Sequence, residues 1–153
     1  MTASVLVILG SDKDAPHLER GLPYFERFGI GYRLVVSSAH RQPEQTASLA
    51  RNARAEGYQA IICVAGMAAH LGGVVAAHTT LPVIGVPIGG SALGGADALY
   101  SFVQMPAGVP VATMAIGPAG FANAVIFCAQ ILALKDPGVA RLLDEFKKEL
   151  AGG

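Results

Sequence analysis

The stretch Ala60-Ile61-Ile62-Cys63-Val64 decides the fold that this sequence predicts. It is apolar without interruption, which is typical of a strand that is covered on both faces, as the strands of parallel sheets are. Comparable apolar runs lie before and after it along the chain. Strands are expected over residues 4–9, 32–36, 60–64, 81–87 and 109–114.

Segments of helical length separate these runs. Apolar residues at Leu18, Leu22 and Phe25 predict a helix after the first strand, with Asp14 as its N-cap and with Pro23 kinking or dividing it. Later helices are expected over residues 43–56, before residue 78, and over 97–103, 117–134 and 137–150. Parallel strands need crossovers of helical length. The pattern therefore predicts a three-layer α/β/α, flavodoxin-like open parallel sheet of about five strands in a single domain, residues 1–153.

The composition excludes several classes of partner. Only 14% of the residues are charged and 52% are hydrophobic, so we expect apolar surface to be buried against other copies of the chain. Lys+Arg and Asp+Glu balance at 11 each without a basic run, which disfavours nucleic acid and anionic membranes. Within the uncharged stretch 98–134, the longest helix-like run is shorter than the about 20 residues that a spanning helix needs.

Cysteine usage and the start of the chain bear on the compartment. Cys63 and Cys128 both lie in apolar runs, as buried thiols of a reducing compartment do. The chain begins without a basic segment or a small-residue cleavage site, so a signal peptide is not expected and the predicted location is cytoplasmic. The four histidines have no ligand spacing, and no metal site is expected.

Polar side chains gather where three of the expected strands end, at residues 10–14, 37–41 and 65–71. The carboxyl ends of parallel strands meet at one rim of the sheet, which is where such folds bind ligands. We therefore expect the three segments to lie close together and to form the functional site.

The first segment offers the hydroxyl of Ser11, the ammonium of Lys13 and the carboxylate of Asp14. A turn that leads into a helix suits a phosphate, and a carboxylate suits ribose hydroxyls. The alternative is that Asp14 only caps its helix. Walker spacing and the three-glycine dinucleotide fingerprint are both missing, so neither an NTPase nor a Rossmann dehydrogenase is supported.

The other two segments each carry a histidine. His40 stands beside Arg41, which makes it a candidate acid/base next to an anion-binding cation. The alternative is that Arg41 pairs with Glu44 and that His40 is an ordinary loop residue. His70 lies in a small-residue, apolar segment, where a lone histidine is more often structural than catalytic.

Four stretches in this order resemble the PurE family of purine biosynthesis over nearly the whole chain. They are Gly10-Ser11-x-x-Asp14, Ser38-Ala39-His40-Arg41-x-Pro43, Ala65-Gly66-x-Ala68-Ala69-His70-Leu71, and the run from Asp97 to Gly117. Arg41 and Ala68-Ala69-His70 resemble class I, the N5-carboxyaminoimidazole ribonucleotide mutases, rather than the class II carboxylases.

The resemblance implies a cofactor-free homo-octamer that moves a carboxylate from N5 of the ribonucleotide to ring carbon C4, through decarboxylation and recarboxylation. The resemblance implies that His40 is the acid/base group and that CO2 is an intermediate held in the site. It also implies substrate-binding roles, which fall on Ser38 and Arg41 for the phosphate, Asp14 for the ribose, Ser11 for the substrate, and Ala65, Gly66, His70 and Leu71 for the base and the CO2 region. Lys13 replaces a phosphate-binding hydroxyl of the family, and an ammonium there is expected to hold phosphate as a point charge.

The sequence departs from the family pattern around the expected pocket, at Lys13, Ala15, Met67, Gly72 and Gly89. Such changes bear on substrate identity more than on fold. Two alternatives therefore stay open. One is a paralogue that carboxylates aminoimidazole ribonucleotide directly with CO2 or acts on a related ribonucleotide, and the other is a non-catalytic nucleotide-binding oligomer.

Overall fold

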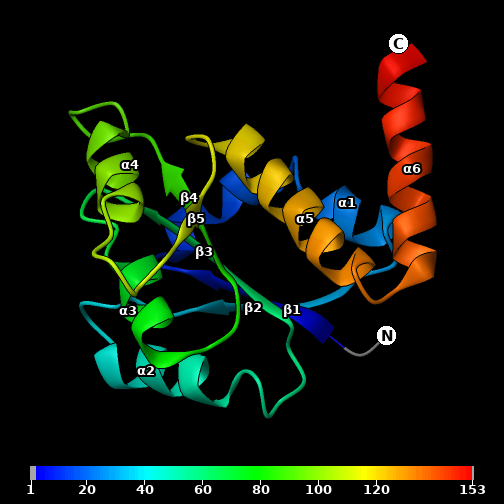
Figure 1. Cartoon of the computed structure of the whole chain (residues 1–153). Helices are drawn as coiled ribbons and strands as arrows, with labels where there is room; N and C mark the ends of the chain where they lie inside the picture. Colours follow the sequence, from blue (N-terminus) through cyan, green and yellow to red (C-terminus); the bar gives the residue numbers. More distant parts are fainter. Residues whose placement is uncertain (1–2, 153) are drawn as a thin grey trace.

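Five parallel strands form one sheet in the order β2-β1-β3-β4-β5 (Figure 1). The computed structural model describes residues 3–152, so the ends of the predicted domain at residues 1 and 153 lie outside the described part. The strands are β1 (Ala3–Leu9), β2 (Gly31–Val36), β3 (Ala60–Gly66), β4 (Val83–Ile88) and β5 (Ala112–Thr113). This strand order is that of flavodoxin, which confirms the predicted fold class.

Helices cover both faces of the sheet. They are η1 (Asp12–Leu18, a 3-10 helix), α1 (Leu22–Arg27), α2 (Pro43–Asn52), α3 (Leu71–His78), α4 (Ala96–Val103), α5 (Pro118–Ala133) and α6 (Pro137–Gly152). One apolar cluster joins the sheet to α1, α5 and α6, and the other joins it to α2, α3 and α4. The predicted three layers are therefore present. None of the helices described is long and apolar enough to cross a bilayer.

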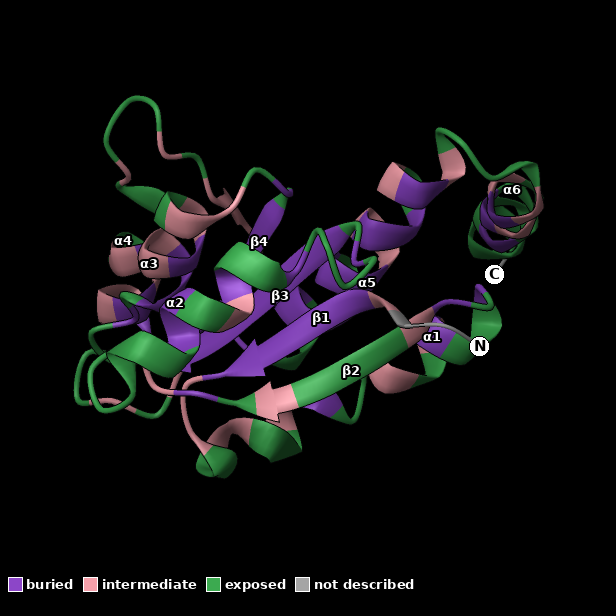
Figure 2. Cartoon of the chain, turned by 90° about the horizontal axis from the view of Figure 1, so that it is seen from below, coloured by how far each residue is buried: buried purple, intermediate pink, exposed green. Residues whose placement is uncertain are grey.

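The central strands explain the unbroken apolar runs in the sequence. Residues 5–9 of β1 and 61–64 of β3 are at most 1% exposed, since helices pack on both of their faces. Burying such aliphatic side chains contributes about 1.5–3 kcal/mol each. The edge strand β2 differs, because much of it is exposed (Figure 2).

The helix expected after β1 is divided, as Pro23 predicts. Proline divides it into η1 and α1, with Pro23 in the first turn of α1, where a missing backbone N–H costs nothing. The predicted N-cap was wrong. Ser11 caps η1 instead of Asp14, and its Oγ accepts a hydrogen bond from the backbone N–H of Lys13 at 3.3 Å.

Two other elements are shorter than predicted. β5 spans two residues instead of 109–114, since Pro110 has no N–H to donate to a ladder. The helix expected to reach residue 56 ends at Asn52. A turn follows it and closes at Gly57, whose φ of 92° favours glycine.

The packing of α5 depends on Gly120. A Cβ at this position would overlap the carbonyl oxygen of Ala115, which precedes the helix. The clash would be with backbone, so no change of rotamer could relieve it. The start of α5 and the segment that leads into it therefore require a glycine here.

We expect Gly120→Ala to lower the free energy of unfolding by about 3 kcal/mol, because the backbone must shift to admit the methyl group. Urea denaturation measures the change. Gly152→Ala is the matched control, since a Cβ there meets nothing within 4 Å. Equal midpoints for the two variants would contradict the role of Gly120.

Candidate active site

Parallel pairing brings three loops to one rim. β1 pairs with β2 on one side and with β3 on the other, so Leu9 stands level with both Val36 and Val64. Two hydrogen bonds continue the ladder into the loops, from Ser37 N to the Leu9 carbonyl (2.8 Å) and from Gly10 N to the Val64 carbonyl (2.9 Å). The predicted convergence of the segments after β1, β2 and β3 is therefore confirmed.

His40 and His70 meet directly at this rim. Nε2 of His40 lies 2.8 Å from Nδ1 of His70, at hydrogen-bonding distance. The ring centroids are 4.9 Å apart and the planes are nearly perpendicular, at 84°. Both side chains are exposed. The structure thus brings two imidazole rings from different loops into hydrogen-bonding contact.

Buried hydroxyls anchor the loop that carries His40. Ser37 and Thr46 are fully buried, and their hydroxyl oxygens are 2.8 Å apart, which ties the end of β2 to α2. Beyond Ser37, Gln42 N donates to the Ser38 carbonyl (2.8 Å) and Ser38 N donates to Oε1 of Gln42 (3.3 Å). Sequence reasoning missed Thr46 and Gln42. The one available signal was the hydroxyl of Thr46 on the buried face of α2, whose other buried residues are Ala47 and Ala50.

Ser38 and Arg41 are adjacent in this loop and free to meet an anion. The backbone N–H of Arg41 donates to Oγ of Ser38 at 3.2 Å, which leaves the serine hydroxyl hydrogen as a donor. Across residues 3–152 the ion pairs join Arg27 to Glu149 and Arg33 to Glu56. The alternative that Arg41 pairs with Glu44 is therefore wrong, and its exposed guanidinium is available.

Ser11, Lys13 and Asp14 share one turn after β1. The Asp14 N–H donates to the Ser11 carbonyl at 3.1 Å, and Lys13 is exposed on the same turn. Burial raises the pKa of the Asp14 carboxyl above its ordinary 3.8, an effect that outweighs the lowering by His17 and by the Ser11 backbone. A carboxylate that is partly stripped of water gains more from hydroxyl donors of a ligand.

The third loop divides the predicted residues into two groups. Ala65 and Leu71 are 6% and 2% exposed, and their side chains pack in the cluster under α2, α3 and α4. They can offer a ligand only their backbone. Gly66 is partly exposed and His70 is exposed, so these two residues reach the rim itself.

Two of the residues that depart from the family pattern, Met67 and Gly72, lie in different structural settings. Met67 adopts φ 54° and is 66% exposed. The left-handed region costs a residue with a Cβ about 1–2 kcal/mol. Gly72 is buried, and a Cβ there would lie 2.6 Å from Cε1 of Phe102, so packing against α4 accounts for this glycine. Ala15 is exposed and Gly89 half-exposed.

Metal and thiol chemistry have little support in the described part of the chain. Among residues 3–152 no group of three His, Cys, Asp or Glu side chains could hold a metal ion. Cys63 and Cys128 are fully buried, and burial raises the pKa of both thiols far above the ordinary value. They therefore stay protonated, with no access to solvent.

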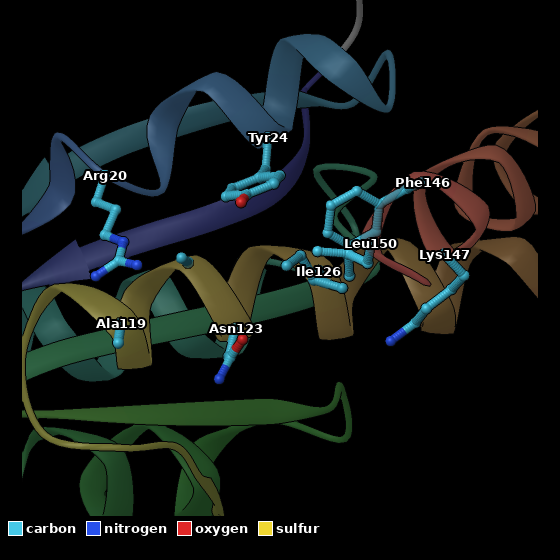
Figure 3. A pocket seen from close by; sticks show the side chains of 9 residues that line it. Arg20, Tyr24, Ala119, Asn123, Ile126, Phe146, Lys147 and Leu150 are labelled. Carbon is cyan, nitrogen blue, oxygen red and sulfur yellow. The ribbon is translucent and has the colours of Figure 1, made fainter. Parts of the chain in front are cut away.

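A cavity of about 220 Å³ lies against α1, α5 and α6 (Figure 3). Its side chains include Arg20, Tyr24, Asn123, Phe146 and Lys147, and none of the predicted site residues lines it. The candidate active site is therefore the exposed rim around His40 and His70.

Comparison with known proteins identifies relatives over nearly the whole chain. The family model described as AIR carboxylase matches residues 4–152. The N5-carboxyaminoimidazole ribonucleotide mutase of Brucella melitensis is 47% identical over 148 residues, covering 97% of this chain and 91% of the relative. The mutase of Thermotoga maritima is 49% identical over 144 residues, covering 94% and 83%.

The fold is also that of a solved relative. The crystal structure of Treponema denticola PurE superposes with a TM-score of 0.86 at 28% identity, covering 97% of this chain and 91% of that one. The resemblance seen in the sequence is thereby confirmed. A match across residues 4–152, relatives close to 50% identical and a shared fold establish that this chain belongs to the AIR carboxylase (PurE) family.

Proposed function

We propose that the protein is an N5-carboxyaminoimidazole ribonucleotide mutase of de novo purine biosynthesis. It moves the carboxylate from N5 to ring carbon C4, giving 4-carboxy-5-aminoimidazole ribonucleotide. The observation that carries the proposal is the pairing of His40 with His70 at the rim that Ser38 and Arg41 share. Relatives 46–49% identical to this chain are mutases of this kind, which supports the same reaction here.

The charged and hydroxyl groups of the rim suit a ribonucleotide. Arg41, Lys13 and the hydroxyl of Ser38 bind the phosphate, because each is exposed or partly exposed and can donate to an anion. Asp14 accepts from the ribose hydroxyls, and Ser11 holds the substrate beside it. These contacts fix the ring so that little motion separates decarboxylation from recarboxylation.

His40 is the acid/base group of the reaction. Breaking the N–C bond releases CO2, C4 attacks it, and the imidazole handles the protons on nitrogen and carbon. Backbone groups of Ala65, Gly66 and Leu71, with the His70 side chain, surround the base and the CO2. The chemistry requires acid/base groups alone, so no cofactor or metal is proposed.

Retaining CO2 requires a closed site, whereas the rim of one chain is open. We therefore include a homo-octamer in the proposal, with neighbouring copies covering the rim. Apolar side chains of β2 remain exposed, at 39% for Tyr32 and 43% each for Leu34 and Val36. With only 14% charged residues, such surface favours burial between copies. A cytoplasmic location fits the two buried thiols.

The proposed reaction is tested with purified protein and synthetic N5-carboxyaminoimidazole ribonucleotide. We expect the wild type to form the C4-carboxylated product and His40→Asn to lose about 10²-fold to 10⁴-fold in kcat, because the acid/base group is gone. Turnover with aminoimidazole ribonucleotide and bicarbonate, but none with the N5-carboxylated substrate, would identify a direct carboxylase instead. Silence with both would favour a nucleotide-binding oligomer.

Lys13→Ala is expected to weaken ribonucleotide binding by about tenfold, because a charge-assisted phosphate contact is lost. The remaining affinity should also be less sensitive to salt, since the screened contact has been removed. Isothermal titration at two ionic strengths measures both effects. Lys135→Ala, at an exposed position just past the C-terminal end of α5, is the control. An unchanged affinity in Lys13→Ala would exclude the phosphate role.

Asp14→Asn is expected to weaken ribonucleotide binding without lowering the stability of the folded protein. Because the pKa of Asp14 is raised in the folded state, the folded protein holds its proton more tightly than the unfolded chain, and this contribution to stability falls as the pH rises past 3.8. At neutral pH the variant should therefore be at least as stable as the wild type while binding ribonucleotide less tightly. A lower denaturation midpoint for the variant at pH 7 would contradict the expectation that Asp14 does not stabilise the folded protein at neutral pH.

A further inference from the structure

The contact between His40 and His70 constrains where protons can sit. At 2.8 Å the two facing nitrogens, Nε2 of His40 and Nδ1 of His70, share a single hydrogen. A neutral imidazole carries one N–H and one bare nitrogen. In the neutral pair, one hydrogen is therefore shared, and the second sits on one of the two outer nitrogens, Nδ1 of His40 or Nε2 of His70.

Of the two outer nitrogens, one therefore carries a hydrogen whenever the other is bare. When the shared hydrogen belongs to His40, Nδ1 of His40 is bare and Nε2 of His70 carries a hydrogen. When the shared hydrogen crosses to His70, Nδ1 of His40 carries the hydrogen and Nε2 of His70 is bare. A proton accepted at one outer nitrogen can thus be released from the other without either ring becoming an anion.

Other features distinguish this pair from a structural histidine. Both rings are exposed, and among the described residues the mutual contact is the hydrogen bond that their side chains make. His78, in contrast, is half-buried, and its Nδ1 contacts the Val74 carbonyl of its own helix at 2.9 Å. The outer nitrogens of the pair are left for a ligand.

The strained turn before His70 also indicates a functional role for this histidine. Met67 holds φ 54° without being glycine, and two tight contacts follow it, from Ala69 N to the Met67 carbonyl (2.9 Å) and from His70 N to the Ala68 carbonyl (2.8 Å). Strain of this kind persists where the surrounding structure imposes it, and it gathers at functional sites. Here the turn delivers His70 to His40.

The reaction under "Proposed function", on which this inference rests, needs one proton moved between two atoms of the substrate. Cleavage of the N–C bond leaves its electron pair on the aminoimidazole, and C4 then attacks CO2 to form the C–C bond. The adduct retains a hydrogen on C4 and has an imine nitrogen at C5. The product requires that hydrogen to leave C4 and the nitrogen to gain one, with no net change in protons.

The geometry points to a two-histidine proton relay that carries out this shift. One outer nitrogen takes the proton from C4, and the electron pair of that C–H bond restores the aromatic ring. The shared hydrogen crosses from the first imidazole to the second, and the other outer nitrogen gives its proton to the imine nitrogen. The pair ends in its opposite tautomer, and exchange with water after the product has left resets it.

His70→Asn tests the relay directly. The asparagine amide lies near the place of Nδ1 and can still hold Nε2 of His40, but it has no outer nitrogen equivalent to Nε2. With N5-carboxyaminoimidazole ribonucleotide, we expect kcat to fall about 10²-fold or more in both His70→Asn and His70→Leu. His78→Gln is the control variant, and its kcat should match that of the wild type.

If His70 only positions the His40 ring, His70→Asn should keep the wild-type kcat and His70→Leu should lose it. That result overturns the relay and leaves the proposed function intact. A wild type that is silent with this substrate overturns the proposed function and the relay together. As a readout independent of turnover, the shared hydrogen should give one low-field imidazole N–H resonance that vanishes in His70→Leu. Its absence from the wild type also overturns the relay.

Discussion

The parallel pairing of β1 with both β2 and β3 is the constraint on which the site depends. Because Leu9 stands level with Val36 and with Val64, three chain segments leave the sheet at the same height. Segments about 30 residues apart in the sequence, those of His40 and His70, can therefore reach a separation of 2.8 Å. A slip of one residue in either pairing would turn the strand over and send these loops apart.

The buried layers around the sheet make this register stable. β1 and β3 are covered on both faces, so their register is fixed by packing and by the ladder together. The end of β2 is held differently, by the buried hydroxyl pair of Ser37 and Thr46, because most of the strand itself is exposed. Close packing at Gly72 and Gly120 fixes where α3 and α5 approach their neighbours. The candidate site residues therefore lie on loops that the packed sheet and helices hold in place.

The sequence predicted the fold because its signals are of long range and redundant. Apolar runs, helical connections and the requirement of crossovers agree on one parallel sheet. The errors arose where local chemistry decides. Pro110 shortened β5, the helix expected to reach residue 56 ended at Asn52, and Ser11 took the capping role expected of Asp14. The convergence of three loops followed from topology, but the contact of His40 with His70 depends on rotamers and on the strained turn at Met67, which spacing does not encode.

In the proposed reaction, one carboxylate moves from nitrogen to carbon within a single site. This transfer is tested most directly with N5-carboxyaminoimidazole ribonucleotide labelled with carbon-13 in the carboxylate, incubated with the wild-type protein in unlabelled bicarbonate. We expect the C4-carboxylated product to retain the label, because the released CO2 is captured before it escapes. Product that carries the isotopic composition of the bicarbonate would contradict intramolecular transfer.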